Sequence, residues 1–166
     1  MASLPEDIKP AMQGWIPSAV VTCSLDGTPN TSQVTQVYYI DENHVALSFQ
    51  FFNKTVKNIR ENPFACVQVR SAKTFERFIL DLEYDHSETE GPVFDKMDMQ
   101  IEALASITGM ADVFKLKAAD IYKVLSVTRL STDINSPVKY RPPLGVIIGF
   151  PLLKLYLFFK KRILKK

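Results

Sequence analysis

Residues 49–63 read Phe49-Gln50-Phe51-Phe52-Asn53-Lys54-Thr55-Val56-Lys57-Asn58-Ile59-Arg60-Glu61-Asn62-Pro63. The apolar start is typical of the end of a strand, and the polar run behind it is typical of a short helix. Asn53 is a favoured N-cap residue. Asn62-Pro63 ends the helix, because proline cannot continue it and restricts the residue before it. The stretch therefore predicts a strand that turns directly into a helix.

The start of this predicted helix is polar and basic. Its spacing places three side chains on one face, namely Lys54, Lys57 and Asn58. Val56 and Ile59 can turn toward a core. Together with the Thr55 hydroxyl, the free N–H groups and the positive end of the helix dipole provide the chemistry that binds a phosphate monoester. The alternative is a solvated surface helix with ordinary lysines, and this stretch alone leaves both open.

The rest of the chain predicts a mainly β fold. Apolar or alternating runs indicate strands at 18–25, 31–40, 44–50, 64–70, 75–84 and, within 118–130, at 121–128. Helices are expected at 5–13 and 94–107. Six short strands in an open sheet would leave exposed edges, so we expect a six-stranded antiparallel closed or split β-barrel.

The predicted helix at 94–107 carries an apolar stripe at helical spacing. The stripe consists of Met97, Ile101, Leu104 and Ala105, and it continues with Ile107 and Met110. Such a stripe is more typical of a core than of a cofactor site. Gly109 is a suitable residue to end this helix.

The first half of the predicted strand at 31–40 is polar on both faces. Its neutral donors and acceptors are Ser32, Gln33, Thr35 and Gln36. These residues are consistent with a solvent-exposed strand start, or with a strand that offers hydrogen bonds to a polar heterocycle.

Charge divides the 166 residues in two. Residues 129–166 hold nine Lys or Arg and one Asp, a net of +8, which leaves −6 for residues 1–128 and +2 for the chain. An acidic body argues against nucleic-acid binding. Cys23 and Cys66 both lie in apolar strand patterns, where free buried thiols are expected, and this fits a reducing compartment. The first ten residues have no apolar segment of the kind found in signal peptides.

Motifs for other chemistries are absent from the sequence. It contains no G-x-G-x-x-G, Walker loop, H-E-x-x-H, C-x-x-C or nucleophile elbow. The two histidines, His44 and His86, have no companion metal ligands at suitable spacing, so no metal site is expected.

With these residues laid out, the body resembles the pyridoxamine 5′-phosphate oxidase-related, FMN-binding split-barrel family. The matching segments are 33–36, 44–50 and above all 51–63, with 90–95 and 101–109 similar to one subgroup. The resemblance covers roughly residues 15–128. It implies a flavin cofactor, FMN, and a homodimer with the flavin between its subunits. Together with the cysteines, the N-terminus and the charge pattern, it leads us to expect a cytoplasmic protein with an FMN-binding domain at 1–130, followed by a basic, apolar tail at 131–166.

The resemblance also implies a set of site residues. The family's basic pair for the FMN phosphate maps to Lys54 and Thr55, where a hydroxyl replaces one cation, and Lys57 one turn on can supply the missing charge. Asn53 and Asn58 belong to the same helix start. The flavin ring maps along the second strand and the end of the third, at Ser32, Gln33, Val34, Thr35, Gln36, Ser48 and Phe49.

Three departures argue against pyridoxamine phosphate oxidation itself. Ser32 stands where the oxidase has an arginine, and Phe78 stands where it has a flavin-contacting glutamine. The oxidase's C-terminal substrate segment has no match in 129–166. Three functions then compete: an FMN-dependent oxidoreductase of unknown substrate, a flavin-sensing module without turnover, and a flavin-free barrel adapted to another ligand or to interaction.

The tail at 142–166 has a composition of its own. Residues 144–159 are apolar except for Lys154, but sixteen residues broken by Pro151 fall short of the roughly 20 needed to span a bilayer. A helix from Pro151 would place apolar and basic residues on opposite sides, as in a helix that lies on an anionic membrane surface. The protein would then be peripheral to the inner face of the membrane. The alternative is a tail that packs on the body or on a second subunit.

Overall fold

The computed structural model describes residues 2–12, 16–51 and 53–130. The expectations for the tail, and for the N-cap side chain of Asn53, fall outside the described part. The helices are η1 (Glu6–Met12), α1 (Asn53–Glu61) and α2 (Pro92–Thr108). The strands are β1 (Ser18–Cys23), β2 (Pro29–Val34), β3 (Val37–Tyr39), β4 (His44–Phe49), β5 (Phe64–Arg70), β6 (Arg77–Glu88) and β7 (Ala118–Leu130). Among the described helices, none has the length and apolar character needed to cross a bilayer.

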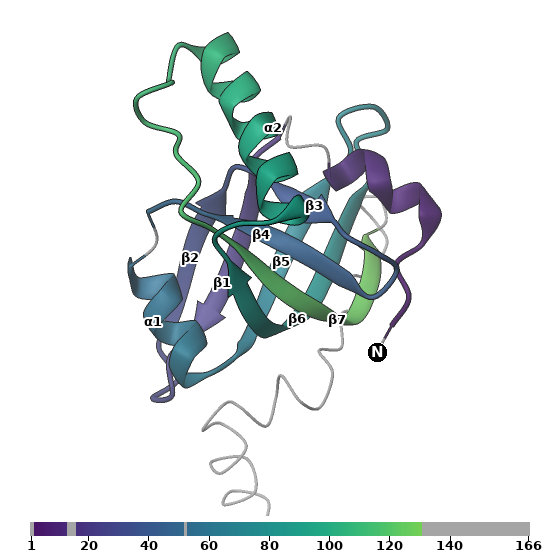
Figure 1. Ribbon diagram of the computed structural model, residues 1–166. Coiled ribbons are helices and arrows are strands. Elements are labelled where there is room, and N and C mark those ends of the chain that lie inside the picture. The colour runs from purple at the N-terminus through teal and green to yellow at the C-terminus, as the bar shows by residue number, and fades with distance from the viewer. Residues whose placement is uncertain (1, 13–15, 52, 131–166) are drawn as a thin grey trace, which may run out of the picture.

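The strands form one curled antiparallel sheet in the order β2-β1-β5-β6-β7-β4-β3 (Figure 1). This confirms the mainly β, split-barrel prediction. The described part has seven strands rather than six, because the strand expected at 31–40 is divided. Its first half, β2, pairs with β1, and its second half, β3, pairs with β4.

The division occurs at Thr35 and Gln36, which we call the corner. The Gln36 backbone N–H donates to the Ser48 hydroxyl (3.1 Å), and the Ser48 N–H donates to the Gln36 carbonyl (3.2 Å). Since β2 and β3 are the two outer strands of the sheet, this continuous segment of chain joins one edge to the other. The polar run that the sequence placed at this point therefore bends the strand and closes the barrel.

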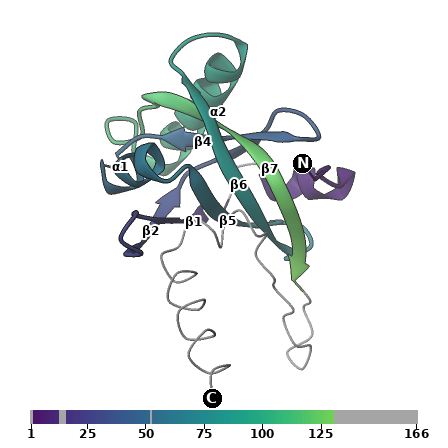
Figure 2. The same cartoon turned by 90° about the horizontal axis from the view of Figure 1, so that it is seen from below.

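Alternate side chains of the strands fill the barrel. Val20, Val67 and Leu80 are buried in a core that also contains Ile8 of η1. Strand alternation explains this pattern, because every second side chain points inward. A second cluster, with Met97 of α2, lies where α2 packs across β4 and β7. In the views of Figures 1 and 2, η1 and α1 lie on opposite sides of the barrel.

Several helices and strands begin or end at residues other than those predicted. The segment at 5–13 is a 3-10 helix that ends at Met12 and contains Pro10. The strand expected to end at residue 84 continues to Glu88, because β7 continues to pair with it past a bulge. Gly109 ends α2 in the left-handed conformation, with φ 68°, as predicted. Cys23 is buried as expected, but Cys66 is only half-buried.

Candidate functional site

One face of α1 is held on the β1–β2 hairpin by a buried polar network. The Asn30 side-chain amide donates to the Thr55 hydroxyl (2.9 Å), which also pairs with the Ser32 hydroxyl (3.0 Å). The Asn58 amide donates to the Thr22 hydroxyl (3.1 Å). Thr55 and Asn58 are 6% and 1% exposed. These hydrogen bonds satisfy the buried polar groups within the protein itself.

Asn58 therefore does not lie with the lysines, and the prediction that it shares an exposed face with them is wrong. Thr55, Asn58 and Ile59 follow the i, i+3, i+4 spacing of a single helix face, and that face packs on the barrel. Ile59 is buried as predicted. Val56 is only half-buried and turns to the side.

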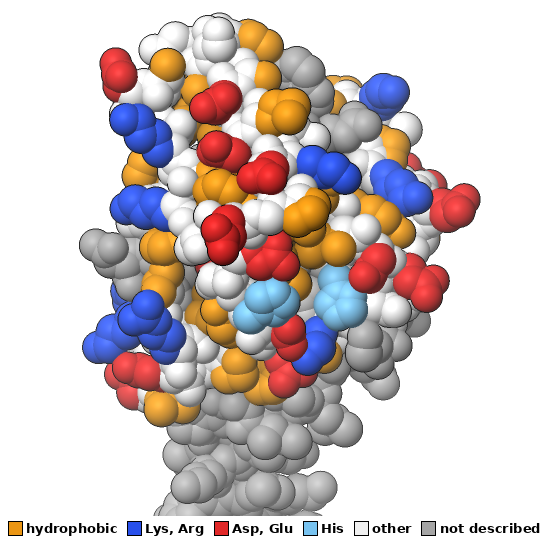
Figure 3. Space-filling model, viewed as in Figure 1, with side chains coloured by type: hydrophobic (Ala, Val, Ile, Leu, Met, Phe, Trp, Pro, Cys, Tyr) orange, Lys and Arg blue, Asp and Glu red, His pale blue; other side chains and the backbone are white. Residues whose placement is uncertain are grey.

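The opposite side of α1 is cationic. Lys54, Lys57 and Arg60 recur every three residues and are all exposed, and we call them the α1 basic face. Figure 3 shows Lys and Arg side chains gathered along the left edge of the molecule, the side on which α1 lies. Beside this face is a cavity of about 390 Å³ lined by Phe49, Val56, Lys57, Arg60 and Glu61. The Lys117 ammonium lies 5.9 Å from the centroid of the Phe49 ring.

Two carboxylates lie near this face. Hydrogen bonds from Ser24 and Thr28, with a smaller contribution from the Lys54 charge, lower the pKa of Asp26 to about 2. Burial raises the pKa of Asp120, which accepts a hydrogen bond from the Ser87 hydroxyl (2.6 Å), while the Arg60 charge acts in the opposite direction. None of the ion pairs among the described residues includes Lys57.

The corner contains two buried polar atoms whose hydrogen-bonding capacity is unused. The Thr35 hydroxyl donates to Gln50 Oε1 (2.9 Å), and Gln50 Nε2 finds no acceptor among the described residues. Gln36 Nε2 donates to Gln100 Oε1 of α2, and Gln36 Oε1 finds no donor there. Gln50 is fully buried and Gln36 is 3% exposed. Leaving such groups unpaired costs free energy, so an unfilled acceptor on Gln36 and an unfilled donor on Gln50, which contacts the neighbouring Thr35, indicate a polar ligand.

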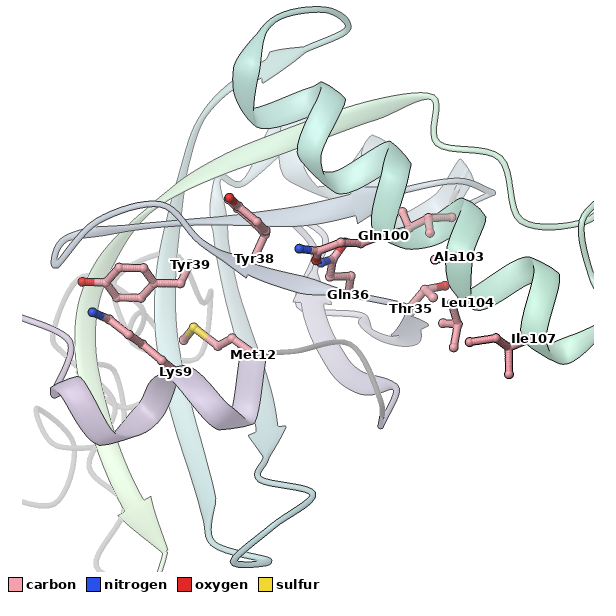
Figure 4. Close-up of a pocket in the computed structure, with 11 residues that line it drawn as sticks. Lys9, Met12, Thr35, Gln36, Tyr38, Tyr39, Gln100, Ala103, Leu104 and Ile107 are labelled. Atoms are coloured by element: carbon pink, nitrogen blue, oxygen red, sulfur yellow. The ribbon is translucent and has the colours of Figure 1, made fainter.

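A cavity of about 450 Å³ opens at the corner, between η1, β3 and α2, and we call it the corner cavity. Its lining residues are Lys9, Met12, Thr35, Gln36, Tyr38, Tyr39, Gln100, Ile101, Ala103, Leu104 and Ile107. Figure 4 shows Lys9, Met12 and Tyr39 at one end, and Thr35, Leu104 and Ile107 at the other. Gln36 and Gln100 lie between the two ends. The volume and the mixture of apolar walls with few polar groups are those of a small-molecule site.

Comparison with known proteins gives structural matches only. No protein-family model matches the chain, and no curated relative matches it. An FMN-binding protein from Syntrophomonas wolfei subsp. wolfei has a similar structure, with a TM-score of 0.62 and 15% identity over 75% of this chain and 85% of its own. A candidate pyridoxamine 5′-phosphate oxidase from Lactobacillus delbrueckii has a TM-score of 0.51 and 10% identity over 76% of this chain and 93% of its own. The fold is that of the FMN-binding, pyridoxamine 5′-phosphate oxidase-like split barrels.

The same fold also serves other ligands. HutZ, the haem storage protein from Vibrio cholerae, has a TM-score of 0.50 and 16% identity over 78% of this chain and 97% of its own. In the present protein, rather than in HutZ, both histidines pair with carboxylates away from the two cavities: His44 with Asp41 (2.9 Å) and His86 with Asp85 (2.7 Å). The described residues contain no group of three or more possible metal ligands.

The split barrel distributes the sequence-predicted site residues of the described part over five places. Thr35 and Gln36 line the corner cavity, and Ser48 is buried against them. Phe49 and Lys57 line the cavity beside α1. The remaining residues are divided between the surface, the core and the buried network. Gln33 and Lys54 are exposed, Val34 is in the core, and Ser32, Thr55 and Asn58 belong to the network.

Some residues that matter for the two cavities were not predicted as site residues from the sequence, among them the lining residues Arg60, Lys9 and Gln100, and Gln50, which contacts Thr35. Arg60 had a usable signal, because it follows Lys57 at i+3 on the same helix face. Gln50 also had a usable signal in the sequence, because it is a polar residue at the apolar end of a predicted strand. Lys9 and Gln100 had none, because only the tertiary structure brings η1 and α2 to β3.

Proposed function

We propose that this protein binds a flavin, specifically FMN, and acts as an FMN-dependent oxidoreductase. The observation that carries the proposal is the unfilled acceptor and donor at the corner, Gln36 Oε1 and Gln50 Nε2. The pyrimidine edge of a flavin alternates carbonyl acceptors with an N–H donor, so it offers partners of both kinds. The likeness in fold to an FMN-binding protein supports the same ligand.

The residues present fit a flavin ring. Gln36 and Gln50 are held in place by Gln100 and Thr35, so their free atoms are already oriented before a ligand arrives. The apolar side chains of α2, Leu104 and Ile107, line the corner cavity together with Gln36 and would exclude water from one side of the ring. A bound flavin supplies hydride transfer at its N5 atom. The protein would contribute orientation, hydrogen bonds and a partly dry environment.

The phosphate is proposed to lie on the α1 basic face. Thr55 and Ser32 satisfy one another and bring no cation, so the charge must come from Lys54, Lys57 and Arg60. Three residues of extended chain, about 10 Å, separate Ser32 beside α1 from Thr35 at the corner. A flavin ring at the corner could therefore reach α1 with a ribityl phosphate chain. Phosphate oxygens accept strong charge-assisted hydrogen bonds from such cations.

Removal of two of these cations should separate FMN from riboflavin. For Lys54→Ala combined with Lys57→Ala, we expect FMN to bind roughly a hundredfold more weakly and riboflavin to bind almost unchanged, because only FMN carries the charge. Both ligands would be titrated into flavin-free protein, with protein fluorescence as the readout. Lys73→Ala combined with Lys96→Ala removes the same charge from exposed sites elsewhere and should leave both affinities unchanged.

Equal weakening of both ligands would show that these lysines do not hold a phosphate. A protein that purifies without yellow colour and takes up neither flavin would overturn the flavin proposal, and a haem spectrum would replace it with the alternative that HutZ illustrates. Steady consumption of NAD(P)H by the yellow protein would distinguish an enzyme from a flavin-sensing module.

We also propose that the protein is a homodimer with the flavin between its subunits. The α2 side chains Met99 and Ile107 are 67% and 71% exposed, and Ile107 borders the corner cavity. A second subunit that covers them would also cover the ring. Light scattering should give about twice the 18.8 kDa mass of one chain. A monomer that binds FMN tightly would exclude a shared site.

A further inference from the structure

The corner cavity extends past the corner itself. Beyond Gln36, its η1 end is formed by Lys9, Met12 and Tyr39, none of which belongs to the flavin-contacting set proposed above. Figure 4 shows these three side chains grouped together, away from Thr35 and Leu104. A ring bound at the corner would therefore have a second compartment of the same cavity beside it.

Lys9 gives this compartment its charge. It is an exposed residue and the one Lys, Arg, Asp or Glu among the described residues that line the corner cavity, and its side-chain nitrogen lies 4.7 Å from the centroid of the Tyr39 ring. The carboxylate closest in sequence, Asp7, pairs with Arg129 instead. No ion pair among the described residues includes Lys9. An ammonium over an aromatic face at the end of a largely apolar cavity favours an anionic group.

The rest of the lining limits what can carry that anion. Met12 is buried, while Leu104 and Ile107 offer apolar surface at the far end. Between the ends, the polar groups are the neutral side chains of Tyr38, Gln36 and Gln100. A ligand with a second charge would find no described partner. An apolar body beside Lys9 would bury its surface against Met12 and Tyr39, since the proposed flavin ring lies at the end with Leu104 and Ile107.

We propose that the corner cavity binds a carboxylic acid with an apolar body as substrate or effector, with its carboxylate on Lys9 and its apolar body extending toward the corner. The inference rests on the proposed flavin site, because it places this acid beside the flavin ring. Lys9 is thus a specificity-determining residue, which selects acids over neutral molecules of the same shape.

The test uses the purified full-length protein, with and without bound flavin, and 2-naphthoate as the probe. For Lys9→Met, which keeps an apolar side chain over Tyr39, we expect naphthoate to bind roughly tenfold more weakly by calorimetry. The neutral analogue 2-naphthamide should bind the variant and the unchanged protein equally. Lys73→Met is the matched control, and it should change neither affinity.

The outcomes separate this inference from the proposed function. Unchanged naphthoate affinity in Lys9→Met, or absence of binding to a yellow protein, overturns the inference and leaves the flavin proposal standing. Lys9-dependent naphthoate binding to a protein that takes up no flavin supports the acid site and overturns the flavin proposal.

Discussion

Phe78→Ala should lower the free energy of unfolding by about 3–5 kcal/mol, the usual cost of removing a buried phenyl ring from a core. Phe78 is 1% exposed and lies in the main core, with the Arg129 guanidinium 4.9 Å from its ring centroid. For a domain of this size the melting temperature should fall by roughly 10 °C. Calorimetry or circular dichroism would measure both quantities.

Two further variants make this expectation specific. Phe75→Ala removes the same ring from a position that is 61% exposed, and it should change the melting temperature by only a degree or two. Phe78→Gln introduces the residue that the oxidase carries here, and it should be about as costly as alanine because it buries an amide in an apolar core. A Phe78→Gln protein that keeps its melting temperature and binds FMN more tightly would place residue 78 in the flavin site.

Truncation after Tyr140 should abolish binding to anionic vesicles and leave flavin binding intact. The removed part includes residues 142–166, which hold six Lys or Arg. Each such residue near an anionic surface contributes about 1 kcal/mol, so the loss should exceed roughly a hundredfold in vesicle affinity. Co-sedimentation with phosphatidylserine vesicles measures this, and binding of the full chain should weaken as salt is added.

This truncation tests the proposed location at the inner face of a membrane. Neutral phosphatidylcholine vesicles serve as the control and should bind neither protein well. A truncated protein that aggregates or comes out colourless would show that the tail is part of the fold. Salt-independent vesicle binding by the truncated protein would assign the membrane contact to the barrel instead.

Local patterns in the sequence were sufficient for most elements of the fold. The change from strand to helix at 49–63 depends on caps, a proline and spacing within fifteen residues, and α1 begins and ends within two residues of its expected limits. The core face of α2 was also predictable, because Met97, Ile101 and Ala105 repeat at helical spacing and are all buried. Ile107, assigned to the same stripe, is 71% exposed, because the helix is apolar on more than one side.

The candidate site was less predictable because its contacts are long-range. Thr35 meets Gln50 across the barrel, and Lys9 meets Tyr39 because η1 packs on β3. No periodicity links these residues. The polar run at 32–36 was recognised as unusual, but one strand pattern could not show that the chain leaves β1 there and joins β4. Asn58 was misplaced because its spacing fits the face of Lys54 as well as that of Thr55, and spacing alone does not show which face packs on the barrel.

The corner also determines how the barrel can come apart. Because β2 and β3 are one run of chain at the two ends of the hydrogen-bonded order, the ring of strands is closed by covalent bonds at this point. Pulling residues 35 and 36 outward would detach strands from β1 and from β4 together, so the two edges should fray as a single unit. A ligand bound at the corner would stabilise both edges of the sheet, β2 and β3, at the same time. At a hundred times its dissociation constant the ligand would add about 2.7 kcal/mol to the stability of the whole barrel, so the proposed flavin would also stabilise the fold.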